Sequence, residues 1–173
     1  TGRCTMTAMQ NRLTDTLLAL AEAEVRFVVA GGVAALLHGV ERVTLDIDVA
    51  LDMEPGNVQR FLEVMEALRL TPRAPVAATL LADPLARTAM VRDKQALVFT
   101  FLDRSDPLWQ VDVFLTNDLS YERLISGSDT ILLDGRAVRI AGIDTLIELK
   151  RRIQPPRPKD VLDLTELERL RRP

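Results

Sequence analysis

Hydrophobic positions along this chain follow two periods, and each predicts a different kind of element. Spacing of three and four residues is typical of a helix with one buried face, and alternation is typical of a half-buried strand. The helical spacing is present at 7–23, 58–70, 143–153 and 159–172, and shorter helices are expected at 33–38, 84–91 and 119–125. Strands are expected at 26–30, 43–51, 96–102, 109–115, 130–133 and 137–140. Residues 71–93 carry three prolines and, apart from 84–91, predict no clear element.

Two pairs of these strands are expected to form hairpins. A turn-rich loop at 103–107 joins 96–102 to 109–115, and Asp134-Gly135 separates the last two strands. Asp-Gly between two short apolar runs is the strongest hairpin signal in the chain. We therefore expect one domain over residues 1–173 that ends in a helical segment at 142–173, with residues 1–5 as an expression remnant before Met6.

Composition restricts the class of protein. The 173 residues are 47% hydrophobic but only 4% aromatic, so the core must be built from aliphatic side chains, as in an ordinary globular domain. The only cysteine is Cys4, which excludes a disulfide framework within one chain. No apolar run is long enough to span a membrane and no signal peptide is visible, so we expect a cytoplasmic protein without a membrane partner. A net charge of −3 provides no general attraction for nucleic acid.

Two aspartates, Asp46 and Asp48, follow a Gly31-Gly32 pair after a short interval. In a strand, residues two apart point to the same face, so both carboxylates would project together with Thr44. Like charges side by side are costly to keep ionised unless a cation lies between them. Glycines allow the backbone to approach a phosphate, and the helix expected at 33–38 would add free N–H groups. The pattern predicts a Mg²⁺ site that faces a phosphate-binding turn.

Asp112 is the candidate for a third carboxylate. It interrupts the apolar strand at 109–115, where a charge is costly without a partner. Val111 and Val113 would face the core, which directs Asp112 to the side of the other two acids. Three carboxylates could hold two Mg²⁺ ions, and such pairs of ions stabilise both the attacking and the leaving oxygen in nucleotidyl transfer.

The combination of these motifs resembles the nucleotidyltransferase superfamily of DNA polymerase beta. The narrower pattern Gly-Gly-x-Ala, His38-Gly39 and Arg42-x-Thr44-x-Asp46-Ile-Asp48 resembles the small bacterial AbiEii-type nucleotidyltransferases, many of them toxins of toxin–antitoxin pairs. The resemblance covers about residues 25–170 and includes the C-terminal runs that begin at Asp144 and Arg157. It implies an α+β nucleotidyltransferase fold, with a mixed β-sheet flanked by helices and C-terminal helices.

The resemblance also implies roles for individual residues. Asp46, Asp48 and Asp112 would be the catalytic and metal-binding acids, with Asp112 as the base for the acceptor hydroxyl. Asp160 and Asp163 would support the site by orienting Lys150 or Arg42. The residues implied to bind the nucleoside triphosphate are Gly31, Gly32, Arg42, Thr44 and Lys150. Gly32 departs from the commoner Gly-Ser turn, so the grip on phosphate would be weaker or would rest on backbone N–H groups.

The resemblance implies transfer of a nucleoside monophosphate from a nucleoside triphosphate, ATP among them, to an acceptor. Five basic residues between Lys150 and Lys159 would suit RNA such as tRNA, although such a run is usually solvated. A protein acceptor, a small-molecule acceptor such as an antibiotic, and a catalytically inactive nucleotide-binding or protein-interaction module are the alternatives. A toxin would also have an antitoxin partner. His38, the only histidine, is interpreted as a structural hydrogen-bonder, and Asp112 could instead pair with Arg42.

Overall fold

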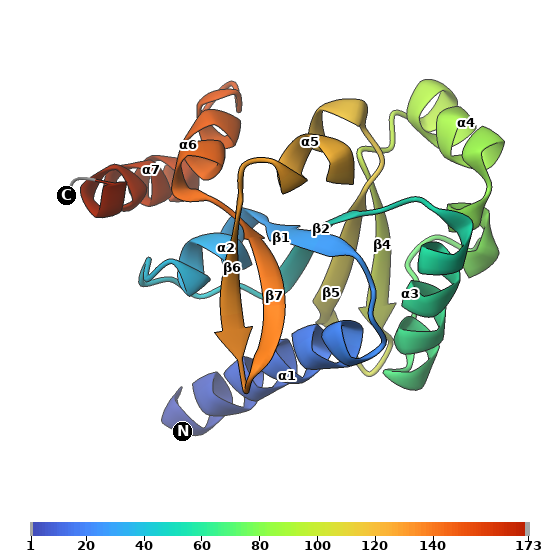
Figure 1. Ribbon diagram of the computed structural model, residues 1–173, viewed down its shortest axis with the longest axis horizontal. Coiled ribbons are helices and arrows are strands. Elements are labelled where there is room, and N and C mark those ends of the chain that lie inside the picture. Colours follow the sequence, from blue (N-terminus) through green and yellow to red (C-terminus); the bar gives the residue numbers. More distant parts are fainter. Residues whose placement is uncertain (1, 172–173) are drawn as a thin grey trace.

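Seven strands form one mixed sheet in the computed structural model, which describes the backbone of residues 2–171 and the side chains of residues 11–171 (Figure 1). The strands are β1 (Phe27–Ala30), β2 (Asp46–Leu51), β3 (Leu70–Pro72), β4 (Val98–Asp103), β5 (Asp106–Phe114), β6 (Ser128–Leu133) and β7 (Arg136–Ala141). Their order in the sheet is β3-β4-β5-β2-β1-β7-β6. The central strand, β2, is parallel to β5 on one side and antiparallel to β1 on the other.

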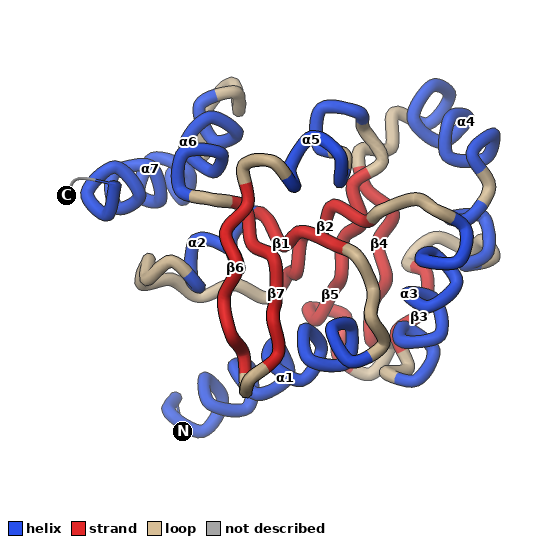
Figure 2. Tube along the Cα trace, in the orientation of Figure 1, coloured by secondary structure: helices blue, strands red, loops and turns tan. Residues whose placement is uncertain are grey.

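Helices surround this sheet, which runs through the middle of the molecule (Figure 2). They are α1 (Gly2–Glu22), α2 (Gly31–Leu37), α3 (Pro55–Ala67), α4 (Pro84–Lys94), α5 (Tyr121–Ile125), α6 (Ile143–Arg151) and α7 (Pro158–Arg171), with 3-10 turns η1 (Ala78–Ala82) and η2 (Asn117–Leu119). α6 and α7 pack against each other and form the predicted C-terminal helical segment. None of the helices in the described part of the chain is long and apolar enough to cross a membrane.

The central strands bury one face and leave the other for polar residues. Ile47 and Val49 on β2 and Val111 and Val113 on β5 are fully buried in an aliphatic core. The alternating positions between them carry acids, since successive side chains of a strand point to opposite faces. The strand pattern thus places Asp48 and Asp112 on the face away from these valines.

Both predicted hairpins are confirmed. β4 pairs with β5 and β6 pairs with β7, each antiparallel. The turn between β6 and β7 has positive φ angles at Asp134 and Gly135, which is the reason that Asp-Gly is favoured there. The end of α2 is also as predicted, because Gly39 takes a φ of 101°.

Three predictions of local structure were wrong. The strand expected at 43–51 begins only at Asp46. Its partner β1 ends at Ala30, which lies opposite Asp48, and the chain then enters α2. Residues 43–45 therefore have no β1 residue to pair with. Thr44 therefore precedes the strand. The glycine pair, expected as a turn before the helix, is itself the first two residues of α2, where the positive φ of Gly31 turns the chain out of β1, and Gly31 and Gly32 are called the glycine turn below. β3 was not predicted, because its three residues end in a proline and are held mainly by pairing with β4.

Candidate active site

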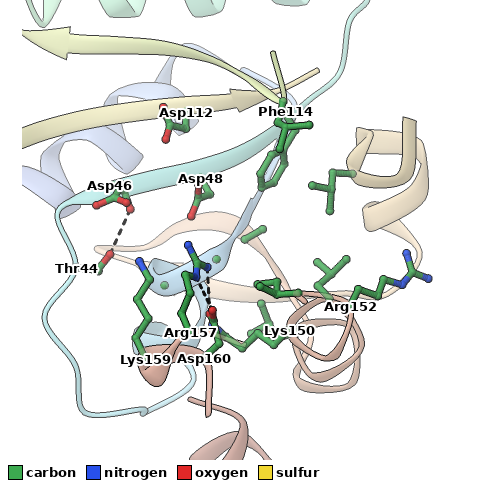
Figure 3. Close-up of a pocket in the computed structure, with 18 of the residues that line it drawn as sticks. Thr44, Asp46, Asp48, Asp112, Phe114, Lys150, Arg152, Arg157, Lys159 and Asp160 are labelled. Carbon is green, nitrogen blue, oxygen red and sulfur yellow. Dashed lines mark hydrogen bonds and ion pairs between the residues drawn. The ribbon is translucent and has the colours of Figure 1, made fainter. Parts of the chain in front are cut away.

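A cavity of about 530 Å³ lies between the sheet, α6 and the start of α7 (Figure 3). Its charged end brings together every residue that the sequence assigned to metal or nucleotide: Gly31, Gly32, Arg42, Thr44, Asp46, Asp48, Asp112 and Lys150. Of the two supporting acids, Asp160 lines the cavity and Asp163 lies directly behind it, bonded to Lys150. Its other end is lined by apolar side chains that the sequence analysis did not assign to the site.

The three acids reach the cavity because of strand register. Asp48 on β2 lies directly opposite Asp112 on β5, and Asp46 is two residues earlier on the same face of β2. Figure 3 shows the three carboxylates along one side of the cavity. Two strands that are distant in sequence thus provide one acidic surface.

Burial raises the pKa values of Asp48 and Asp112, and the positive charges nearby do not offset this effect. Burial, the nearby Asp112 and then Asp46 raise the pKa of Asp48 to about 7, against the opposing charges of Lys159 and Arg42. Burial also raises the pKa of Asp112, although a hydrogen bond from Thr100 acts in the opposite direction. The Oδ1 atom of Asp112 is buried and has no hydrogen-bond partner. A buried, unsatisfied carboxylate oxygen is rare in a folded protein, and a bound ion, a bound water or a catalytic role accounts for most such cases.

These acids fit a divalent cation in chemistry but do not enclose one in this arrangement. Oxygen ligands with unbalanced negative charge are what Mg²⁺ prefers. The described side chains nevertheless include no group of three His, Cys, Asp or Glu residues spaced to hold a single ion. Asp46 is solvent-exposed at the first position of β2, so its carboxylate must rotate inward to share an ion with Asp48 and Asp112.

The two glycines leave room for two different side chains. Gly31 has a φ of 58°, and a Cβ there would overlap the carboxylate of Asp48. A Cβ on Gly32 would lie 2.7 Å from the Cζ and Nη2 atoms of Arg42 and 2.9 Å from the Oγ1 atom of Thr44. The guanidinium of Arg42 occupies the space that a serine side chain would need.

A second group of charges, in and just behind the wall of the cavity, forms ion pairs, although the buried Nε atom of Arg42 has no partner. Lys150 Nζ lies 2.6 Å from Asp163 Oδ2 and 3.3 Å from Asp160 Oδ1, and Arg42 donates a hydrogen bond to the same Asp163 oxygen. Arg157 Nε donates to Asp160 Oδ2 at 2.6 Å. Burial alone would raise the pKa of Asp160, but the bonds and charges of Arg157 and Lys150 outweigh it and lower the pKa. The alternative that Arg42 pairs with Asp112 is wrong, because Arg42 pairs with Asp163.

The basic run divides between the cavity and solvent. Lys150 is 7% exposed and points inward, whereas Arg151 and Arg152 form exposed ion pairs with Glu168 and Glu148, and Arg152 also lines the cavity. Arg157 and Lys159 project from the start of α7 toward Asp46 and Asp48 (Figure 3). The sequence showed that these residues are basic, but their direction depends on the path of the break between α6 and α7.

Two other residues have the structural roles that were expected. His38 Nε2 lies 2.9 Å from the carbonyl oxygen of Ala141, which ties the end of α2 to β7. Trp109 is buried, with the guanidinium of Arg12 4.9 Å from its ring. Neither residue belongs to the cavity.

Comparison with known proteins agrees with this geometry. A solved structure of an antigenic nucleotidyltransferase-like protein from Paracoccidioides brasiliensis superimposes with a TM-score of 0.54, covering 90% of this chain and 73% of that one. This chain has a nucleotidyltransferase fold. The two sequences are only 13% identical, so the likeness concerns the arrangement of the elements. No protein-family model matches the sequence. No curated protein matches it either.

Proposed function

We propose that this protein is a Mg²⁺-dependent nucleotidyltransferase that moves a nucleoside monophosphate from a nucleoside triphosphate to an acceptor hydroxyl and releases pyrophosphate. The observation that carries the proposal is the half-buried Asp112 carboxylate, whose buried Oδ1 atom has no partner, in register with Asp48 and in the same cavity as the two glycines. A structural carboxylate at this position would have been paired, as Asp160 and Asp163 are.

Asp46, Asp48 and Asp112 would hold the metal. Mg²⁺ bound there would neutralise phosphate charge and stabilise the attacking and leaving oxygens. Asp112 would accept the proton of the acceptor hydroxyl, because it lies in register with Asp48 at the place where the acceptor must approach the metal. Arg42 lies beside Gly32, the position of the serine in the commoner Gly-Ser turn. Its guanidinium would hold the leaving phosphates in place of the missing serine hydroxyl.

For Lys150, which the resemblance implied to bind the nucleotide, we propose a supporting role instead. Its ammonium group is buried and bonds two aspartates, so it stabilises the wall of the cavity rather than presenting a free charge. Through Asp163, it is joined to Arg42 and would fix the direction of that guanidinium. Arg157 and Lys159, which are exposed and face the acids, are the cations placed to meet a phosphate that enters from solvent.

The finer assignments are also part of the proposal. RNA such as tRNA is favoured as the acceptor over protein, because Arg152, Arg157 and Lys159 lie at the cavity. An AbiEii-type toxin with an antitoxin partner in the cytoplasm is the proposed biological setting, and its support is the motif pattern alone.

A second candidate is a nucleotide-binding module without catalysis. The exposed position of Asp46 favours it, since the three carboxylates do not enclose one ion. In such a module Asp46→Asn leaves the biological effect unchanged, whereas in an enzyme it removes that effect.

The direct test is transfer of label from α-³²P nucleoside triphosphates to a pool of RNA and, separately, a pool of proteins in Mg²⁺. The wild-type protein is expected to label one pool, and Asp46→Asn or Asp112→Asn to lower transfer at least about 100-fold. Asp134→Asn is the matched control, because Asp134 lies in the β6–β7 turn outside the cavity. Equal labelling by wild type and Asp112→Asn would contradict the proposal.

A further inference from the structure

The apolar end of the cavity has no part in the chemistry described above. It is lined by Phe114 at the end of β5, Leu119 in η2, Leu149 in α6 and Ile153 just after α6. This end is continuous with the charged end, so one cavity changes from acidic and basic walls to aliphatic and aromatic walls. A ligand that fills it must be charged at one end and apolar at the other.

Phe114 is placed by the same strand geometry as the acids. It follows Asp112 by two residues on β5, so both side chains leave the same face of the strand about 7 Å apart. Figure 3 shows the ring of Phe114 extending into the cavity beyond Asp48 and Asp112. Aromatic contacts in the described chain join Phe61 with Phe101 and Phe99 with Phe101, and the Phe114 ring shares in neither. Phe114 is partly buried against the core, and the rest of its side chain lines the cavity, where a ligand can contact it.

The order of the strands sets the direction of that ligand. In the sheet, β2 lies between β5 and β1, and Gly31 follows directly after β1. The acids of β2 and β5 therefore lie between the glycine turn on one side and Phe114 on the other. A triphosphate at Gly31, Gly32 and Arg42 leaves the rest of the nucleotide to extend past the acids toward Phe114.

We infer that the apolar end is a nucleobase subsite, in which the base stacks on Phe114 opposite Leu149 and Ile153. This inference rests on the proposed function and deepens it, since it names the surface that binds the nucleoside part of the substrate. Stacking on an aromatic ring accepts every base, because every base has a π-face. The subsite therefore contributes affinity for a nucleotide over inorganic phosphates.

The test compares ligands with and without a base. Binding of ATP and of inorganic tripolyphosphate is measured by calorimetry in Mg²⁺ for wild type, Phe114→Ala and Phe114→Leu. Loss of a base–aromatic stack is worth about 1–3 kcal/mol, so ATP is expected to bind about 5- to 150-fold more weakly to Phe114→Ala. Tripolyphosphate affinity is expected to be unchanged. Leu132→Ala, an exposed apolar position on β6, is the control for loss of surface hydrophobicity.

Each outcome decides the inference. Weaker ATP binding with unchanged tripolyphosphate binding supports the subsite. ATP binding that is equal in wild type and both variants overturns the subsite and leaves the proposed function intact. If wild type binds neither ligand, the proposed function fails as well. Phe114→Leu keeps most of the side-chain volume, so it retains the test if Phe114→Ala does not fold.

Discussion

Two sets of aspartates lie around one cavity, and they differ in how their charge is balanced. Asp160 and Asp163 are almost completely buried, yet each bonds a basic group from Lys150, Arg42 or Arg157. Asp48 and Asp112 are less buried but have no such bonds, and their pKa values are raised. Burial alone therefore does not identify a ligand site. The lack of a bonded basic group is what distinguishes Asp48 and Asp112 from the paired acids, and we propose that a cation takes its place.

The paired set should be the more sensitive to mutation. Asp163→Asn removes the charge shared by Lys150 and Arg42, and breaking a buried ion pair typically costs about 3–5 kcal/mol. We expect the free energy of unfolding to fall by about 3 kcal/mol in urea denaturation with EDTA present. Asp118→Asn, an exposed position on η2, is the control. A loss of less than about 0.5 kcal/mol would mean that the pairs do not support the fold.

Substitution in the unpaired set, Asp48 and Asp112, should raise the free energy of unfolding rather than lower it. Asp48→Asn removes a buried charge that faces Asp46 and Asp112, so the metal-free protein should become more stable by about 1–2 kcal/mol at pH 8. The same urea denaturation in EDTA measures it. A destabilised variant would show that Asp48 is held by bonds within the protein and would remove the distinction between the two sets.

Substitution of Gly32 tests the contact between Gly32 and Arg42, the residue that also pairs with Asp163. Gly32→Ser would displace the guanidinium of Arg42, and overpacking of this kind typically costs about 1–3 kcal/mol. We expect a loss of about 1–2 kcal/mol in stability, and the double variant Gly32→Ser/Arg42→Ala to show less than the sum of the two single losses. Additive losses in this double-mutant cycle would contradict the contact. Gly56→Ser, where a Cβ would first meet Glu54 Oε2 at 3.3 Å, is the matched control.

The smallest expected effect is in the pH dependence of the paired set. The pKa of Asp160 is lowered in the folded protein, so its contribution to stability is present above the unfolded value of about 3.9 and is lost as pH falls through the folded value. Between pH 5 and 3, wild type should lose about 1 kcal/mol more than Asp160→Asn. Urea midpoints across this range measure the difference, and parallel pH profiles would exclude it.

Sequence reasoning predicted the parts of the molecule that depend on local patterns. The two hairpins follow from the turn residues between their strands, and the direction of Asp112 relative to its valine neighbours follows from strand alternation. The third strand and the first residues of the expected 43–51 strand could not be predicted in this way. They depend on which partner strand is available, and pairing is a long-range property.

Within the site, too, local patterns predict some features, and features that depend on the path of the chain remain unpredicted. Alternation on β5 would have pointed to Phe114, because it lies two residues after Asp112. The contact of Arg42 with Gly32 could not be read from the sequence, since it depends on the path of residues 38–45 back across α2. The orientation of Arg157 and Lys159 likewise depends on where α7 begins against the sheet.

The central claim is that Asp46, Asp48 and Asp112 are unpaired because they hold a divalent cation together with a nucleotide. Mn²⁺ binding followed by electron paramagnetic resonance, with a non-hydrolysable nucleoside triphosphate present, tests it most directly. Wild type and Asp134→Asn are expected to bind Mn²⁺ equally, and Asp48→Asn and Asp112→Asn to lose at least about tenfold in affinity. Equal Mn²⁺ affinity in wild type and these two site variants would contradict the account.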